Sequence, residues 1–86
     1  MYTVYILKSI IVDRYYIGHS ADLDKRLSEH NSGKTKSTKA YAPWKVVYTE
    51  EYNTKSEAYK KELEIKSFKS GIKFRNLINS ESWQSG

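Results

Sequence analysis

The sequence predicts an α+β domain in which helices pack on one small, three-stranded antiparallel sheet. Three observations support this class. The length of 86 residues is that of a single domain, runs of β-branched and aromatic residues are typical of strands, and other segments carry helical spacing and capping signals. The expected order is strand, strand, helix, strand, helix, helix. We expect the domain to span residues 1–79, followed by a flexible tail at 80–86 from which Trp83 could dock.

Strands are expected where aromatic and β-branched residues cluster, at residues 2–8, 14–19 and 44–52. The connection around Asp13 is short enough to join the first two strands as an antiparallel hairpin. Trp44 follows Pro43 at the start of the third strand. We expect its ring to anchor the core rather than to stack on a base.

Helices are expected at residues 21–32, 54–71 and 72–79. Ser20 is the predicted N-cap of the first helix, and Gly33 is its predicted stop. Thr54 and Glu57 have the spacing of a capping box at the start of the second helix, which explains Glu57 without assigning it any chemistry. Residues 34–43 have no apolar period and predict an exposed loop.

The composition predicts a globular, basic protein. Fifteen Lys and Arg residues stand against ten Asp and Glu residues, for a net charge of +5, and 38% of the residues are hydrophobic. The chain has no cysteine, which excludes a disulfide framework and a cysteine zinc site and fits a reducing cytoplasm. Because Lys8 interrupts the N-terminal apolar run, we expect neither a signal peptide nor a membrane span.

Much of the positive charge gathers in two segments. Residues 34–45 contain four lysines and no acid, and residues 60–75 contain six basic residues against two acidic ones. A basic stripe interleaved with hydroxyl and aromatic side chains suits contacts with phosphate groups. A solvated lysine surface has the same composition, so charge alone leaves both interpretations open. The candidate nucleic-acid-binding residues are Gly18, His19, Lys34, Lys36, Lys39 and Lys66.

Arg26 and His30 lie four residues apart on the first predicted helix, beside the apolar stripe of Leu23 and Leu27. The two polar side chains therefore project together. Taken singly, His30 is explained by the helix dipole at a C-terminus and Arg26 by a surface position. The pair indicates chemistry only if another element of the fold supplies a phosphate site.

Glu62 has an unusual position on the second predicted helix. The apolar residues of this helix share one arc, formed by Ala58, Tyr59, Leu63 and Ile65. Glu62 and Lys66 fall inside this arc. Burying an unpaired carboxylate costs on the order of several kcal/mol, so the charge must be compensated. The alternatives are an ion pair with Lys66 or Arg26, or a divalent cation at the rim of a cleft, and periodicity leaves both open.

With these residues in this order, the chain resembles the GIY-YIG nucleases. This family includes homing endonucleases, the N-terminal domain of a DNA-repair excinuclease and small stand-alone bacterial proteins. The resemblance rests on Tyr5, Tyr16-Ile17-Gly18, Arg26, His30, Ala58 and Glu62. It runs from residue 2 to about residue 78, and segments 30–34 and 42–44 are similar to the small stand-alone group.

Two positions depart from the family pattern. The first motif reads Thr3-Val4-Tyr5, with threonine where the family usually has glycine. The tyrosine is the chemical member of this motif, so we expect activity to survive. The family also has an asparagine after the glutamate, for which Asn76 is the nearest candidate.

The resemblance implies a metal-dependent endonuclease acting on DNA. Glu62 would be the single protein ligand of one Mg²⁺ or Mn²⁺, which would neutralise charge on the leaving oxygen. Arg26 would stabilise the pentacoordinate phosphate. Tyr5 or Tyr16 would orient or deprotonate the attacking water, and His30 would hydrogen-bond a tyrosine. Which tyrosine is the base stays open, and either needs a nearby cation because a free tyrosine has a pKa of about 10.

Two other functions remain open. One is a nucleic-acid-binding module of the same fold that no longer cleaves. The other is a structural or partner-binding domain in which Glu62 and Lys66 form only an ion pair. So small a domain has little surface for reading base edges, so we expect structure-guided or weakly specific cutting. A protein partner, a monomer and a weak dimer are all compatible with the sequence.

Overall fold

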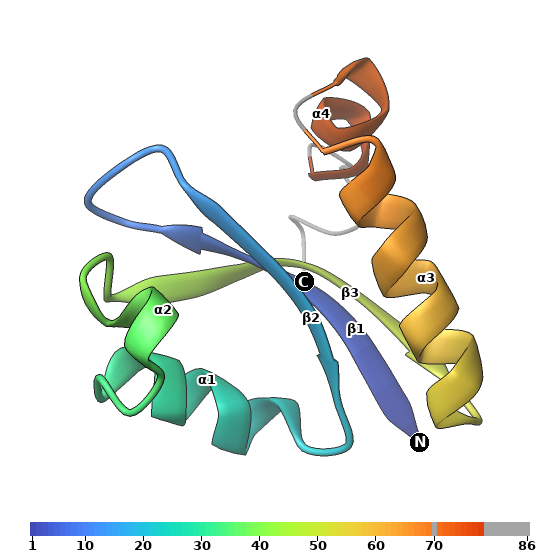
Figure 1. The fold of residues 1–86 in the computed structure, drawn as a ribbon, viewed down its shortest axis with the longest axis horizontal. Helices are drawn as coiled ribbons and strands as arrows, with labels where there is room; N and C mark the ends of the chain where they lie inside the picture. The colour runs from blue at the N-terminus through green and yellow to red at the C-terminus, as the bar shows by residue number, and fades with distance from the viewer. Residues whose placement is uncertain (70, 79–86) are drawn as a thin grey trace.

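Strand β1 (Tyr2–Ser9) is the centre of the sheet in the computed structural model of the protein, which describes residues 1–69 and 71–78. It pairs antiparallel with β2 (Tyr15–Ser20) on one side and with β3 (Trp44–Tyr52) on the other (Figure 1). The sheet order is therefore β2-β1-β3, which leaves β2 and β3 as edge strands. The predicted antiparallel sheet and its first hairpin are confirmed.

Helices cover both faces of this sheet (Figure 1). Helix α1 (Leu23–Asn31) and the short α2 (Lys36–Lys39) lie on one face, and α3 (Lys55–Ser67) and α4 (Ile72–Ile78) lie on the other. The predicted α+β class and the order β-β-α-β-α-α are confirmed, with α2 as an addition. The expected tail at 80–86, including Trp83, lies outside the described residues. Within those residues, no helix combines the length and apolar character that a bilayer crossing requires.

Alternation along β1 divides the core into two clusters, because successive side chains of a strand point to opposite faces. Val4 and Ile6 point toward α3 and α4, where they pack with Ile17, Ala58, Ile65 and Phe74. Tyr5 and Leu7 point toward α1, where they pack with Trp44. Trp44 is 4% exposed, so its predicted role as a core anchor is confirmed.

The start of α1 differs from the prediction. Asp22, not Ser20, is the N-cap, because its carboxylate accepts the backbone N–H of Lys25 at 3.1 Å. The Ser20 hydroxyl instead bonds both backbone groups of Asp22 in the turn after β2. Gly33 has the positive φ of 83° that follows many helix ends, as predicted.

Helix α3 begins with the predicted capping box of Thr54 and Glu57. It ends at Ser67, earlier than predicted, because Phe68 leaves helical geometry. Its buried face is also narrower than the predicted arc. Ala58, Glu62 and Ile65 are buried, whereas Tyr59 and Leu63 are 50% and 47% exposed. A sheet of only three strands covers one narrow stripe of the helix, so the flanking apolar residues stay in solvent.

The lysine-rich segment 34–43 is not the fully exposed loop that the sequence predicts. It contains α2, and Thr38 within α2 is only 2% exposed. The Thr38 carbonyl accepts the indole N–H of Trp44 at 2.9 Å, and the Thr38 hydroxyl contacts His30. These polar anchors hold the segment against the α1 face, while the side chains of Lys34, Lys36 and Lys39 remain at least partly exposed.

Candidate active site

Tyr5 and Gly18 face each other across the β1–β2 pair. A Cβ atom placed on Gly18 would lie 2.9 Å from the Tyr5 hydroxyl and 3.1 Å from a ring carbon of Tyr16. The two phenol side chains therefore pack against the Gly18 backbone, in the space that a side chain would occupy at any other residue type. The sequence predicts such a close approach at Gly18, and the structure identifies the approaching groups.

Tyr5, Tyr16 and His30 form an aromatic cluster on the α1 face of the sheet. The Tyr5 and Tyr16 ring centres are 6.3 Å apart, and the rings are nearly parallel at 26°. The His30 ring lies 4.7 Å from Tyr16 and 6.4 Å from Tyr5, centre to centre. Three candidate residues from β1, β2 and α1 thus meet in one place.

Arg26 lies one helical turn before His30. Its guanidinium donates a hydrogen bond of 2.9 Å to Glu29 on the same helix. The nearby Tyr5 hydroxyl is the main influence that raises the pKa of Arg26. The Arg26 side chain is 38% exposed, so it reaches the phenol cluster while remaining open to a ligand from solvent.

Tyr5 is protonated at neutral pH. Burial raises the pKa of Tyr5 above its ordinary value of 10.0, and the neighbouring Arg26 opposes that rise without cancelling it. Tyr16 and Glu62 also act to raise the Tyr5 pKa. In this state the Tyr5 hydroxyl can donate a hydrogen bond, and it needs a further cation nearby before it can act as a base.

His30 is fully buried, and burial lowers its pKa, with Arg26 adding to the effect. The ring is therefore neutral at pH 7. Its Nδ1 lies 2.8 Å from the Thr38 hydroxyl oxygen, which itself donates to the Thr35 carbonyl at 3.3 Å. The network assigns the proton of His30 to Nδ1, because the Thr38 hydrogen is already used. Nε2 is then a bare acceptor, with no partner among the described residues.

Glu62 is 8% exposed on the inner face of α3. One carboxylate oxygen lies 2.5 Å from His19 Nδ1, and the other accepts from Lys66 Nζ at 2.6 Å. Burial acts to raise the pKa of Glu62, but the bonds from Lys66 and His19 outweigh it, so the pKa lies below its ordinary value. Glu62 is ionised and compensated by Lys66. The alternative pair with Arg26 is not among the ion pairs of the described residues, in which Arg26 pairs with Glu29 and Glu62 pairs with Lys66 and His19.

His19 is the partner of Glu62 that sequence reasoning missed. The phosphate contact expected at this position stays a prediction. The His19 side chain is 17% exposed and packs 5.8 Å from the Tyr59 ring centre. The available signal was the two-residue period of β2, which puts His19 on the same face as the buried Ile17.

The phenol cluster and Glu62 lie on opposite faces of the sheet, and both border the edge strand β2. Gly18 and His19 are consecutive, so one borders Tyr5 and the other borders Glu62. Gly18 is buried beneath the phenols and Lys66 is 48% exposed. Asn76 lies on the exposed side of α4.

A hydrated divalent ion fits this arrangement. No group of three His, Cys, Asp or Glu residues able to hold a metal occurs in the described part of the chain. Mg²⁺ needs no such group, because it keeps several waters and takes one or two carboxylates. Each Glu62 oxygen has a second lone pair beyond the bonds to His19 and Lys66.

A comparison with protein families decides the family of the chain. The profile of the GIY-YIG catalytic domain matches residues 1–73. The chain belongs to the GIY-YIG family. Members of this family are generally endonucleases that use divalent metals, and the domain implies nucleic-acid binding.

The relatives of this chain carry names that state no activity. A UPF0213 protein of Staphylococcus saprophyticus is 48% identical over 54 residues, 62% of this chain and 66% of that protein, slightly under two thirds of its length. A UPF0213 protein of Staphylococcus aureus is 44% identical over 61 residues, 70% of this chain and 74% of that protein. The solution structure of a UPF0213 protein from Bacillus halodurans is 31% identical, with a TM-score of 0.46, and covers 93% of this chain and 98% of that one.

Proposed function

We propose that this GIY-YIG protein is a metal-dependent endonuclease that hydrolyses phosphodiester bonds in DNA at the edge of β2. One observation supports this most. The Tyr5 hydroxyl lies against Gly18, and the Glu62 carboxylate bonds the next residue, His19, so the two groups flank one short segment of β2. Together with the Arg26 guanidinium, which lies near Tyr5, these are the groups that a metal-dependent phosphodiester hydrolase needs.

Glu62 would hold one Mg²⁺ or Mn²⁺ by a carboxylate oxygen. The ion supplies charge neutralisation at the leaving oxygen. His19 would keep the carboxylate in place, because its Nδ1 bonds one Glu62 oxygen. Lys66 has a long, half-exposed side chain that can move aside.

Arg26 would bind the scissile phosphate and stabilise the charge that develops on its equatorial oxygens. The Arg26 guanidinium already donates a hydrogen bond to Glu29 and lies beside Tyr5. The position of the guanidinium is therefore set before the substrate arrives. The exposed part of the side chain gives a phosphate access to the remaining donors.

Tyr5, Tyr16 and His30 would prepare the attacking water. Tyr5 holds its proton and would orient the water by donating or accepting a hydrogen bond. His30 Nε2 is a buried acceptor beside the Tyr16 ring and would take a hydrogen bond from a phenol or from the water. The tyrosine that acts as base is left open between Tyr5 and Tyr16.

A second candidate is a nucleic-acid-binding module of the same fold that does not cleave. The observation that favours it is the compensation of Glu62 by Lys66 and His19, which explains a buried carboxylate without any metal. The lysines of segment 34–39 would provide phosphate contacts in either case. The family resemblance favours DNA over RNA as the bound nucleic acid. The absence of cysteine from the sequence favours a cytoplasmic location.

The deciding experiment compares wild type with Glu62→Gln. Flapped, branched and single-stranded DNA and RNA are incubated with protein in Mg²⁺, Mn²⁺ or EDTA. The matched control is Glu64→Gln on the same helix, where the carboxylate is 59% exposed and pairs only with Lys61 at the surface. Metal-dependent cutting that is lost in Glu62→Gln and kept in Glu64→Gln supports the endonuclease. Binding without cutting by the wild type supports the module.

A further inference from the structure

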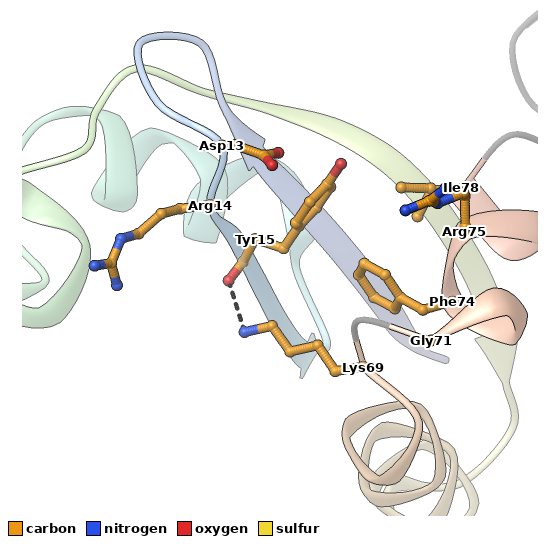
Figure 2. A pocket seen from close by; sticks show the side chains of 8 residues that line it. All are labelled: Asp13, Arg14, Tyr15, Lys69, Gly71, Phe74, Arg75 and Ile78. Carbon is orange, nitrogen blue, oxygen red and sulfur yellow. Dashed lines mark hydrogen bonds between the residues drawn. The ribbon is translucent and has the colours of Figure 1, made fainter.

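A second hollow lies away from the phenol cluster, between the start of β2 and the corner of α3 and α4 (Figure 2). Its volume of about 670 Å³ is that of a small-ligand site. The residues that line it include Asp13, Tyr15, Lys69, Phe74 and Arg75. Segments far apart in the sequence therefore supply its walls.

The floor of this hollow is aromatic. Tyr15 and Phe74 pack edge to face, with ring centres 5.1 Å apart and planes at 86°. Phe74 is only 3% exposed and belongs to the core, whereas Tyr15 is partly exposed. A ring that is fixed by the core and open on one side is a platform on which a flat ligand can stack.

Two cations border the floor. Lys69, just after α3, donates to the Tyr15 carbonyl at 3.2 Å, which holds its ammonium at the hollow (Figure 2). Arg75 of α4 also lines the hollow. Burial raises the pKa of the Tyr15 hydroxyl, with Asp13 adding to the rise and Arg75 opposing it. The ion pairs among residues 1–69 and 71–78 include neither Lys69 nor Arg75. Arg14 points away from the hollow, over the Tyr41 ring.

The hollow lies along the same two elements as the candidate active site. Tyr15 and His19 lie on one face of β2, and Glu62, Lys66 and Lys69 follow one another along α3 and its end. With a rise of 1.5 Å per helical residue, Lys66 lies roughly 6 Å along α3 from Glu62, and Lys69 follows after the helix ends at Ser67. Stacked nucleotides of one strand advance by about 3.4 Å each, so the distance from Glu62 to Lys66 already spans about two nucleotides.

We propose that the hollow is a nucleotide-binding subsite for the single strand that flanks the scissile phosphate, with a base against Tyr15 and a phosphate between Lys69 and Arg75. The identification of the strand as the flank of a cleaved bond rests on the proposed nuclease function. The binding of a nucleotide unit does not, because stacking and charge carry it without metal. An internal phosphate and a terminal 5′-phosphate offer the same chemistry to these two cations.

The test measures binding of fluorescent single-stranded oligonucleotides by anisotropy in EDTA, over a series of salt concentrations. Arg75→Ala is compared with Lys73→Ala, a substitution of the same charge on the same helix at an exposed residue outside the hollow. We expect Arg75→Ala to weaken binding on the order of tenfold. We also expect it to reduce the slope of log affinity against log salt by about 0.7, the value for one phosphate contact on a single strand. Equal losses in the two variants would overturn the proposal.

The aromatic platform is tested with Tyr15→Phe and Tyr15→Leu, each checked for its melting temperature. Tyr15→Phe keeps the ring and should bind as wild type does. Tyr15→Leu should lose affinity on the order of tenfold, and equal binding by the two variants argues against stacking. Oligonucleotides with and without a 5′-phosphate separate the two phosphate sources. If cutting depends on Glu62 but not on Arg75, the proposed subsite is wrong and the nuclease function stands. If binding depends on Arg75 and no cutting is detected, the nuclease function is wrong and the subsite stands.

Discussion

His30 Nδ1 lies 2.8 Å from the hydroxyl oxygen of Thr38, in a pair that is closed to solvent on both sides. Thr38 belongs to α2, in the lysine-rich segment, and its carbonyl is tied to the Trp44 indole. The segment that carries the phosphate-binding candidates therefore also sets the orientation and tautomer of a ring in the candidate active site.

Thr38→Val should lower nuclease turnover and stability. Valine keeps the shape but leaves the His30 Nδ1–H without its acceptor, and a buried unpaired donor costs about 1–3 kcal/mol. If His30 no longer carries its proton on Nδ1, Nε2 is no longer a free acceptor beside the tyrosines, so kcat should fall more than KM rises. Thr38→Ser is the matched control, because it restores the hydroxyl. ¹⁵N NMR of the His30 ring reports the tautomer directly, and an Nδ1–H signal unchanged in Thr38→Val contradicts the assignment.

Acid should destabilise the protein through His30. Burial holds the folded pKa of His30 below the unfolded value of 6.5. The unfolded chain therefore binds more protons in this range, so the contribution is complete above about pH 6.5 and is lost as pH falls toward the folded pKa. Urea denaturation at a series of pH values measures this slope. His30→Gln should flatten the profile just below pH 6.5, and a slope there that survives the substitution must come from another group.

Gly18→Ala should disturb the phenol cluster. The new methyl group would meet the Tyr5 hydroxyl at 2.9 Å and Tyr16 at 3.1 Å, so at least one ring must move. Such overpacking costs about 1–3 kcal/mol of the free energy of unfolding, and cutting should fall because the tyrosines lose their positions. Gly33→Ala is the comparison. It strains a φ of 83° at the end of α1 and should cost stability by about 1–2 kcal/mol while leaving cutting intact. Equal activity losses at equal stability would mean that the Gly18 effect is only structural.

The sheet and helices were predictable because local signals agreed with the fold. Aromatic and β-branched runs marked all three strands, and the capping box of Thr54 and Glu57 marked the start of α3. The spacing of Arg26 and His30 predicted only that the two side chains project together, and the family resemblance implied that they act with the tyrosines. The width of the α3 interface was not predictable, since helical spacing does not tell how many strands lie beneath. For this reason Tyr59 and Leu63 share the predicted apolar arc and are nevertheless exposed.

The polar contacts of the site were harder to predict. His19 and Glu62 are 43 residues apart, and Thr38 lies in a segment with no apolar period. Buried polar pairs such as His30 with Thr38 leave no hydropathy pattern, because each residue alone is typical of a surface. Glu62 was the exception. Its place between apolar residues on one helical face required a partner, and periodicity could not choose between Lys66 and a metal.

Lys66→Met separates these two partners of Glu62. Removing the ammonium leaves the carboxylate with only His19, so the protein in EDTA should be less stable. The same change removes the cation that competes with a metal for the carboxylate, so Mg²⁺ or Mn²⁺ should raise the melting temperature more in Lys66→Met than in wild type. Lys61→Met, on the same helix but paired with Glu64 at the surface, should show neither effect. Melting curves with and without metal measure both quantities. If metal stabilises Lys66→Met no more than Lys61→Met, Glu62 serves the ion pair and not a cation.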